Sequence, residues 1–290
     1  MRHVAFLTLH DPADFVIDDE LAVLPLARRG IQVETIPWDR PGVDWRRYAL
    51  VVIRSTWDYQ HRAARFLAVL EDIEHQGVRL ENGSDIVRWN MQKTYLRELA
   101  AKGIETVPTF WREGLGPGEL VPLFEELRSP EGVIKPVLSG NAQGAWRLDA
   151  ARARELAPEI EAYFAARPLM MQPFERGIAE EGEFSMIYFN GRHSHSILKV
   201  PRAGDFRVQE EHGAEIISIQ PEPALLEAGN AAIAAIGQKL LYARADLVRS
   251  GDTFRVLELE LVEPSIYLRT DAGAAERFAA AVAERAGHVD

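Results

Sequence analysis

Short apolar runs alternate with segments of helical periodicity over the first third of the chain. The runs at residues 3–9, 31–36 and 49–53 have the length and composition of buried strands. Between them, apolar residues recur at helical spacing over residues 18–29 and 61–76, and a glycine ends each segment, as expected at a helix C-cap. Strands that alternate with helices predict a parallel sheet with functional loops at the carboxyl ends of its strands. Those loops would be residues 10–14 and 54–59.

The pattern changes near residue 90 and becomes antiparallel in the last third. A helix is predicted over residues 90–102, ending at Gly103, and a short strand at 132–136 leads into a loop of small residues at 139–144. The dipeptide Asn190-Gly191 between two apolar runs favours a type I′ hairpin. The other predicted elements are a helix over 149–166, strands at 184–189 and 192–200, a helix over 222–242, a hairpin of strands 245–249 and 253–261, and an amphipathic helix over 273–286.

These elements predict a fold of the α/β plus α+β class. We expect an α/β domain over residues 1–88, a second unit over residues 89–170 and an α+β unit over residues 171–290. The apolar C-terminal helix could pack on the core or on a partner subunit, and the second arrangement would make a homo-oligomer. Both alternatives are open at this point.

Composition narrows the class of protein. Asp and Glu outnumber Lys and Arg by 44 to 33, and the formal net charge of -11 argues against a nucleic-acid-coating surface. The sequence has no cysteine, which excludes a disulfide scaffold, thiolate metal ligands and a cysteine nucleophile. Its apolar runs are shorter than the roughly 18 residues of a membrane span, and no signal-peptide pattern opens the chain. We therefore expect a soluble, cytoplasmic protein with a small-molecule substrate and no nucleic-acid or membrane partner.

Four charged residues near the C-terminus share a pattern of chemical interest. Side chains alternate between the faces of a strand, so Glu258 and Glu260 point the same way, as do Arg244 and Asp246. If the two strands pair, three carboxylates and one guanidinium converge on one face. Such hard oxygen ligands suit Mg²⁺. From the spacing alone, a solvated sheet face is an equally good interpretation.

Two lysines and a small-residue loop suggest a phosphate site. Lys135 closes a buried strand, and Lys93 lies one turn into the helix predicted from residue 90; each would be stabilised by an anion such as phosphate. The loop 139–144 could lay its backbone N–H groups over phosphates, although it lacks the Walker A ending and no G-x-G-x-x-G follows the first strand. Alone, each lysine is more often a surface residue.

Three further segments could line a nucleotide site. The apolar stretch 170–174 contains one amide and precedes Glu183, a combination that suits a purine base and ribose hydroxyls, although a core strand followed by a turn is the commoner interpretation. Lys199, Arg202 and residues 204–207 form a basic patch that could hold phosphoryl oxygens. His193 and His195 show no metal-ligand spacing and are expected to be structural.

Taken in order, these segments resemble the ATP-grasp superfamily, of the glutathione synthetase and D-alanine–D-alanine ligase type, over about residues 90–265. The resemblance implies a pre-ATP-grasp α/β domain followed by two α+β ATP-grasp subdomains. It also implies ATP and Mg²⁺, with two ions, as cofactors. The site residues that it implies are Lys93, Lys135, Ser139 and Gly140 at the phosphates, Gln172, Pro173 and Phe174 at adenine, Glu183 at ribose, Lys199 near the phosphates, Arg244 at the acyl-phosphate, and Asp246, Glu258 and Glu260 on the metals. The sequence departs from the family at Glu260, where Asn is usual, and in a loop with fewer glycines.

More narrowly, residues 54–59, 88–90, 204–207 and 259–264 resemble a bacterial subgroup that includes the O-ureido-serine cyclo-ligase of D-cycloserine formation. The subgroup implies activation of a carboxylate as an acyl-phosphate, followed by attack of a nitrogen in the same molecule, with residues 139–144 and 200–212 closing as a lid. We expect an amino-acid-like substrate. The residues expected at the substrate are Asp11 and, second to it, Asp18 or Asp19 at the ammonium, Arg54 and Arg207 at a carboxylate, with Arg207 also assisting catalysis, and Glu263 and Ser265 elsewhere along the substrate.

Two alternatives accompany this interpretation. An intermolecular amino-acid or peptide ligase of the same fold would need a second substrate, so turnover of ATP with one substrate alone distinguishes the two. A non-catalytic ATP-binding regulatory module would more often lack some of the lysines and acidic residues. A hydrolase that uses paired carboxylates is more remote, because it would leave the ordered lysines without a purpose.

Overall fold

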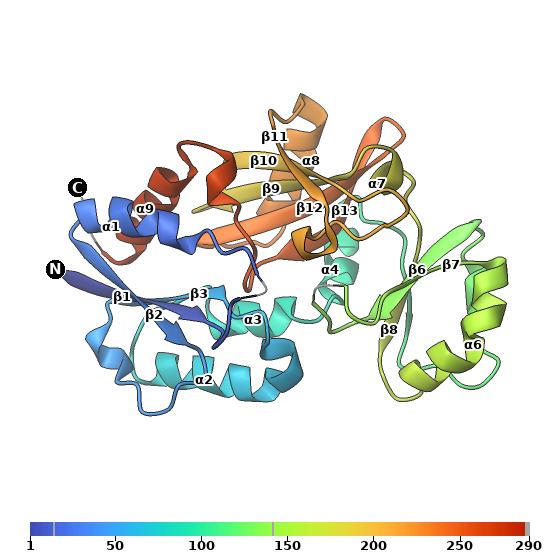
Figure 1. Ribbon diagram of the computed structural model, residues 1–290, viewed down its shortest axis with the longest axis horizontal. Coiled ribbons are helices and arrows are strands. Elements are labelled where there is room, and N and C mark those ends of the chain that lie inside the picture. Colours follow the sequence, from blue (N-terminus) through green and yellow to red (C-terminus); the bar gives the residue numbers. More distant parts are fainter. Residues whose placement is uncertain (14, 141, 288–290) are drawn as a thin grey trace.

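The computed structural model describes residues 1–13, 15–140 and 142–287, and three separate sheets organise them (Figure 1). Asp14 of the first predicted loop and Asn141 of the small-residue loop lie outside these residues. The three sheets lie along the long axis of the molecule. The N-terminal sheet lies at one end, and the sheet formed by residues 110–173 lies at the other. Across this part of the chain, no helix combines the length and the apolar character needed to cross a membrane.

The N-terminal sheet is parallel, as the alternating pattern predicts. Its order is β2 (Ile31–Pro37), β1 (Arg2–Thr8), β3 (Leu50–Ser55) and β4 (Leu80–Glu81). Side chains of η1 (Asp19–Ala22) and α1 (Val23–Arg28) pack in the core cluster of one face, and those of α2 (Ala63–His75) and α3 (Ser84–Asn90) in that of the other. The 3₁₀ turns η2 (Trp45–Arg47) and η3 (Tyr59–Arg62) lie in the connections before and after β3.

The C-terminal helix α9 (Ala274–Arg285) packs within the chain. Phe278, Ala279 and Val282 have no exposed area, and the Phe278 ring lies 6.1 Å from that of Phe6 and 5.2 Å from that of Phe189. This apolar face therefore joins the N-terminal sheet to the third sheet, and of the two open alternatives the helix takes the core.

The second sheet is antiparallel, with the order β5 (Phe110–Arg112), β8 (Leu169–Pro173), β6 (Glu131–Pro136) and β7 (Trp146–Asp149). Helices α5 (Leu120–Glu126) and α6 (Ala150–Phe164) supply the side chains that pack against it. Asp149 caps α6 by accepting from two main-chain N–H groups, as expected for an acidic N-cap. The division expected after residue 170 falls inside β8, which is paired to β6 along its whole length.

The third sheet is antiparallel and carries most of the charged residues singled out in the sequence. Its order is β11 (Glu215–Ile219), β10 (Arg192–Val200), β9 (Glu183–Phe189), β12 (Tyr242–Ser250) and β13 (Thr253–Glu260). Asn190 and Gly191 both have positive φ, at 47° and 73°, which is the backbone of the predicted type I′ turn. The helices of this region are α7 (Gly177–Glu180) and α8 (Pro223–Ala234), and the short turns are η4 (Glu210–His212) and η5 (Leu268–Thr270).

Two predicted helices are wrong in extent. The helix predicted over 222–242 ends at Ala234, because Gly237 takes a φ of 82° and the chain then enters β12 to pair with β9. The helix predicted over 90–102 begins too early: α3 ends at Asn90, Lys93 lies in the turn that follows, and only α4 (Tyr95–Ala101) runs within the predicted range. The main-chain N–H of Lys93 donates to the Val137 carbonyl at 3.0 Å instead of continuing a helix.

Candidate active site

A cavity lies where the three sheets meet. Its walls include Lys135 from β6, Gln172 from β8, Glu183 from β9, Lys199 from β10 and Glu258 from β13. Sixteen of the residues expected in the site line it, whereas Asp11, Arg54 and the second-choice Asp18 and Asp19 do not. Those that do are Lys93, Lys135, Ser139, Gly140, Gln172, Pro173, Phe174, Glu183, Lys199, Arg207, Arg244, Asp246, Glu258, Glu260, Glu263 and Ser265.

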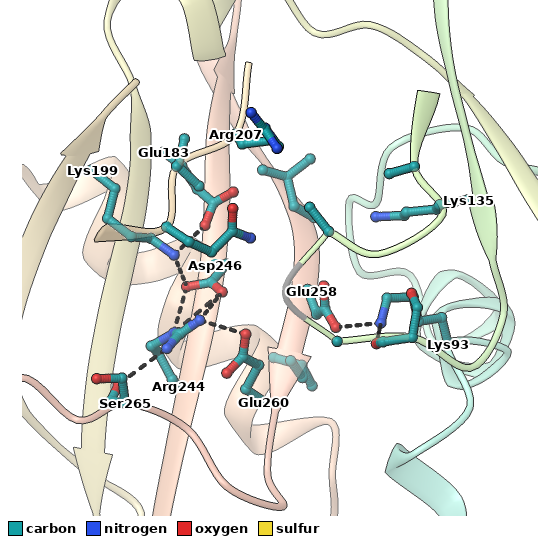
Figure 2. Close-up of a pocket in the computed structure, with 18 of the residues that line it drawn as sticks. Lys93, Lys135, Glu183, Lys199, Arg207, Arg244, Asp246, Glu258, Glu260 and Ser265 are labelled. Atoms are coloured by element: carbon teal, nitrogen blue, oxygen red, sulfur yellow. Dashed lines mark hydrogen bonds and ion pairs between the residues drawn. The ribbon is translucent and has the colours of Figure 1, made fainter. Parts of the chain in front are cut away.

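The carboxylates of β12 and β13 share one face, as the alternation predicts. Arg244 lies opposite Glu260 and Asp246 opposite Glu258 in the strand register. The Arg244 guanidinium binds Asp246 at 2.8 Å and Glu260 at 2.5 Å, both from Nη2 (Figure 2). Arg244 and Asp246 are 5% and 3% exposed, so the solvated sheet face considered from the sequence is excluded for this pair.

Two lysines approach this carboxylate row from opposite sides (Figure 2). Lys93 Nζ binds Glu258 at 2.8 Å, and Lys199 Nζ binds Glu183 at 2.5 Å and lies 3.6 Å from Asp246. Lys199 is buried on β10, so the first residue of the predicted basic patch belongs to a strand of the third sheet. A buried charge without a partner is strongly unfavourable, so each lysine stays paired with its carboxylate until another anion replaces it. A bound phosphate would therefore have to compete with these carboxylates for the lysines.

Burial and neighbouring charges set opposite protonation behaviour along the row. Burial works to raise the pKa of Asp246, but Arg244 and Lys199 hold it at about 2. Burial also works to raise the pKa of Glu258, and Lys93 and Lys135 bring it below its usual value. Burial raises the pKa of Glu260 to about 7, and the charges of Asp246 and Glu258 oppose the help from Arg244. Glu260, which stands where the family usually has Asn, is therefore the carboxylate closest to protonation at neutral pH among Asp246, Glu258 and Glu260.

The donor chemistry of the row fits Mg²⁺. Within residues 1–13, 15–140 and 142–287, no three acidic or imidazole groups are arranged to hold a metal ion by themselves. Mg²⁺ commonly binds through one or two carboxylates and completes its shell with water and substrate phosphate oxygens, so such a preformed cluster is not required. Asp246, Glu258 and Glu260 offer hard oxygen donors on one wall of a cavity whose other side carries Lys93 and Lys135.

The small-residue loop lies over the lysine side of the cavity. Lys93 Nζ donates to the Ser139 carbonyl at 2.9 Å, while burial lowers the pKa of Lys135. A Cβ at Gly140 would lie 2.3 Å from Nε2 of Gln60 in η3, so any larger residue at this position would make the Gln60 side chain shift. The loop predicted from the sequence to lie over phosphates therefore lies next to Gln60 of the N-terminal unit.

The predicted adenine segment lies at the carboxyl end of β8, an inner strand of the second sheet, and lines the cavity. Gln172 is buried and donates from Nε2 to Thr109 Oγ1 at 3.0 Å. The Arg147 guanidinium lies 3.7 Å from the centroid of the Phe174 ring, and Val133 and Leu257 add apolar lining. The combination of apolar walls and strand backbone suits a planar base.

Arg54 stands apart from its expected role as a substrate ligand. It is 2% exposed, its Nε donates to Asp19 at 2.9 Å, and its guanidinium lies 5.0 Å from the Tyr242 ring centroid. Asp11 is exposed and accepts from the main-chain N–H of Ala13. Both residues follow strands whose ends were expected to reach the substrate, but burial turns Arg54 into the core, and Asp11 caps its own loop.

Arg207 does line the cavity, where Asp205 binds it at 2.7 Å. Lining residues that the sequence interpretation missed include Phe15, Trp57, Tyr59, Gln60 and Tyr267. Trp57 and Tyr59 belong to the 54–59 segment that carried part of the resemblance, so that segment was the available signal. No local pattern marks Phe15 or Tyr267.

The strand that carries Glu258 and Glu260 lies at the edge of its sheet, and polar side chains complete its hydrogen bonds. Asn90 donates to the Leu259 carbonyl and accepts from the Leu261 N–H, each at 2.9 Å. Tyr95 Oη also donates to the Leu259 carbonyl at 3.0 Å. These buried side chains provide the hydrogen bonds that a further strand would otherwise make at this edge. They hold the main chain of Leu259, between the two carboxylates, in place.

Comparison with known proteins gives consistent results. The family model described as D-cycloserine synthetase DcsG, N-terminal domain, matches residues 4–82. The cycloserine biosynthesis protein DcsG of Streptomyces lavendulae is 33% identical over 301 residues, which cover 95% of this chain and 96% of that protein. The crystal structure of D-cycloserine synthetase DcsG superimposes with a TM-score of 0.85 at 29% identity and covers 98% of this chain and 99% of that one.

More distant structures share the fold. D-alanine–D-alanine ligase from Bacillus anthracis, solved with ATP, has a TM-score of 0.70 at 16% identity and covers 99% of this chain and 97% of that one. The ATP-grasp ligase PsnB, solved with a minimal precursor, Mg and ADP, has a TM-score of 0.65 at 16% identity, with 98% of each chain covered. At this identity the likeness concerns the fold alone.

Proposed function

Since the chain belongs to the D-cycloserine synthetase family of ATP-grasp ligases, we propose that it closes the ring of O-ureido-D-serine to form D-cycloserine. The chain is an ATP-dependent ligase. The observation that carries the specific reaction is the 33% identity over almost the whole of both chains, together with a cavity lined by every lysine, arginine and acidic residue that the ATP-grasp resemblance implies. A non-catalytic module is not favoured by that complete set.

The reaction begins with the substrate's carboxylate. One of its oxygens attacks the γ-phosphorus of ATP, ADP leaves, and an acyl-phosphate forms. The nitrogen bonded to the side-chain oxygen then attacks the acyl carbon, inorganic phosphate leaves, and a five-membered ring closes. Water removes the carbamoyl group as carbamic acid, which breaks down to carbon dioxide and ammonia. Because both reacting groups belong to one molecule, binding holds them close and replaces a second encounter.

The basic residues divide between the two steps. Lys93 and Lys135 would hold phosphate oxygens on one side of the cavity, and Lys199 would approach them from the other. Arg244, held by two carboxylates, points its guanidinium at the cavity and would stabilise the oxyanion that forms when nitrogen attacks. Arg207 would stabilise the transferred phosphoryl group. The segment 172–174 would hold adenine and Glu183 the ribose, releasing Lys199 to the phosphates.

Asp246, Glu258 and Glu260 would hold Mg²⁺, and we propose two ions. When bound, Mg²⁺ neutralises negative charge on the phosphate oxygens. The extra charge of Glu260, in place of the usual Asn, should strengthen metal binding once the ion displaces its contact with Arg244.

Two loops would exclude water, which would otherwise hydrolyse the acyl-phosphate. They are residues 139–144, with residue 141 outside the description, and residues 200–212; Ser139, Gly140 and Arg207 of these loops line the cavity. We also propose a three-unit organisation with a first division near residue 88 and a second that follows β8 rather than cutting it at residue 170, a small-molecule substrate and a cytoplasmic location.

The test is release of ADP in the presence of Mg²⁺ and ATP with O-ureido-D-serine as the only other substrate, with the product mass recorded. The L-enantiomer and a panel of amino acids serve as comparison substrates. The proposal expects ADP and cycloserine in equal amounts. Release of ADP only after a second amine is added would instead establish an intermolecular ligase.

A further inference from the structure

A short segment after β13 is held in place by its main chain. Three consecutive carbonyl oxygens each accept from a side chain: Glu263 from the half-buried Trp57 Nε1 at 2.8 Å, Pro264 from the buried Arg54 Nη2 at 3.2 Å, and Ser265 from the buried Arg244 Nη1 at 3.1 Å. Two of the three donors come from the end of β3 in the N-terminal sheet. The contacts leave the segment's side chains free to face the cavity, which Glu263 and Ser265 line.

The Glu263 side chain lies against polar and aromatic side chains of the N-terminal unit, and the charges of Glu260, Glu258 and Lys93 act on its pKa. Gln60 Nε2 lies 3.4 Å from Glu263 Oε1, and Tyr59, Trp57 and Phe15 line the same cavity, with the last two rings 5.0 Å apart. Over the described ranges, no lysine, arginine or histidine forms an ion pair with Glu263, although burial and the charge of Glu260 raise its pKa to about 8. An acidic group in this position suits a cation supplied by the ligand.

The other acidic residues are already committed. Asp18 and Asp19, once expected at the ammonium, bind Arg269 and Arg54, each at 2.9 Å. Of the carboxylates that line the cavity, Glu175 binds Arg255 at 2.9 Å and Glu210 binds Arg269 at 2.5 Å. Glu183 binds Lys199, and Asp246, Glu258 and Glu260 form the proposed metal row. Glu211 is exposed, which leaves Glu263 as the fixed and uncommitted carboxylate of the wall.

We propose that Glu263 binds the α-ammonium group of the substrate, and that Arg54 and Trp57 are positioning residues that hold its main chain. The inference rests on the proposed function, because that substrate carries an ammonium beside the carboxylate to be activated. Ammonium capture at Glu263 would orient the α-carbon while the carboxylate turns toward Arg244 and the lysines. In this proposal the 54–59 segment positions Glu263 through Arg54 and Trp57, and Arg54 does not contact the substrate itself.

The decisive experiment compares two substrates in three proteins. The substrates are O-ureido-D-serine and the same compound with hydrogen in place of the ammonium, 3-(ureidooxy)propanoate. The proteins are wild type, Glu263→Gln, which keeps the shape and the contact with Gln60, and Glu227→Gln, which removes an exposed acidic charge on α8. Steady-state kinetics give kcat and KM for each substrate and the KM for ATP.

The proposal expects Glu263→Gln to lower kcat/KM for the amino substrate by roughly 30-fold or more, since truncation of one partner of a buried charge pair costs at least that much. With the deaminated compound, wild type and Glu263→Gln should agree within about threefold, and the KM for ATP should stay unchanged. Glu227→Gln should match wild type throughout. An equal loss on both substrates would make Glu263 a structural residue, and no loss on either would remove it from the site.

Trp57→Phe tests the positioning role, because it keeps an aromatic ring and removes the hydrogen bond to the Glu263 carbonyl. We expect a reduced preference for the amino substrate over the deaminated one, with an unchanged KM for ATP and an unchanged circular dichroism spectrum. An unchanged preference would overturn the role of Trp57. Absence of any wild-type turnover of O-ureido-D-serine would contradict the proposed function itself, and this proposal with it, whereas turnover that is indifferent to Glu263→Gln contradicts the proposal alone.

Discussion

Replacement of Asn90 by alanine should destabilise the protein through one main-chain group next to the strand that carries Glu258 and Glu260. Asn90 is 7% exposed and bonds two main-chain groups at the edge of β13, the Leu259 carbonyl and the Leu261 N–H. The two losses are unequal. The Leu259 carbonyl keeps the Tyr95 hydroxyl at 3.0 Å, whereas Asn90 is the side chain that satisfies the Leu261 N–H.

The magnitude follows from that difference. A hydrogen bond with a remaining alternative contributes about 1 kcal/mol, and a buried donor left without a partner costs roughly 1–3 kcal/mol. Asn90→Ala should therefore lower the free energy of unfolding by about 2–4 kcal/mol. The carboxylates of Glu258 and Glu260 flank Leu259, so kcat should fall as well, because the strand's edge is no longer fixed.

Equilibrium urea unfolding followed by far-ultraviolet circular dichroism measures the effect, with Asn230→Ala as the matched control. Asn230 is exposed on α8, and its substitution should change stability by less than about 0.5 kcal/mol. A loss below about 1 kcal/mol for Asn90→Ala, similar to the control, would refute the assignment of Asn90 as the hydrogen-bonding substitute for a neighbouring strand.

Three further predictions concern charge and close packing. Burial lowers the pKa of His195 to about 4, below its unfolded value, so at this residue the unfolded chain binds more protons and His195 should cost about 2 kcal/mol of stability from pH 7 to pH 5. Glu260 and Glu263, whose pKa values are raised, act in the opposite direction over this range, so the effect is measured as a difference: the stability change from pH 7 to pH 5, from urea unfolding, should be about 2 kcal/mol less unfavourable in His195→Gln than in wild type. An equal change in the two proteins would contradict the assignment. Gly140→Ala should raise the KM for ATP several-fold in steady-state kinetics without a change in Tm, because its Cβ would meet Gln60 2.3 Å away; an unchanged KM would show that Gln60 simply moves aside. Glu260→Asn should raise the Mg²⁺ concentration for half-maximal ADP release by roughly tenfold, since it removes a charged oxygen donor, and an unchanged Mg²⁺ requirement would place Glu260 outside the metal site.

The sequence predicts well those features that depend on local periodicity. The alternation of Arg244 with Asp246 and of Glu258 with Glu260 places their side chains on one face whatever the rest of the fold does, and the strand register then brings them opposite one another. Asn190-Gly191 likewise predicts its turn because both residues tolerate positive φ.

Features that depend on long-range contacts could not be predicted in this way. Lys93 sits in a turn because its main chain bonds to Val137, more than forty residues away, and helical spacing through residues 90–102 hides that interruption. Arg54 follows the strand predicted over residues 49–53, where a substrate ligand is expected, but the structure places it inside β3, with Asp19 and the Pro264 carbonyl bound to its guanidinium. The position of Arg54 in the sequence suggests a substrate ligand, whereas its burial and contacts indicate a structural role.

The central claim is that a substrate carboxylate passes through an acyl-phosphate before the ring closes, and oxygen labelling tests it most directly. O-ureido-D-serine with both carboxylate oxygens as ¹⁸O would be turned over with Mg²⁺ and unlabelled ATP, and the phosphate and cycloserine analysed by mass spectrometry. The account predicts one ¹⁸O in each molecule of phosphate and one in the ring carbonyl of each product. Release of unlabelled phosphate together with the cyclised product would contradict it, because the carboxylate would then have been closed without phosphoryl transfer to its oxygen.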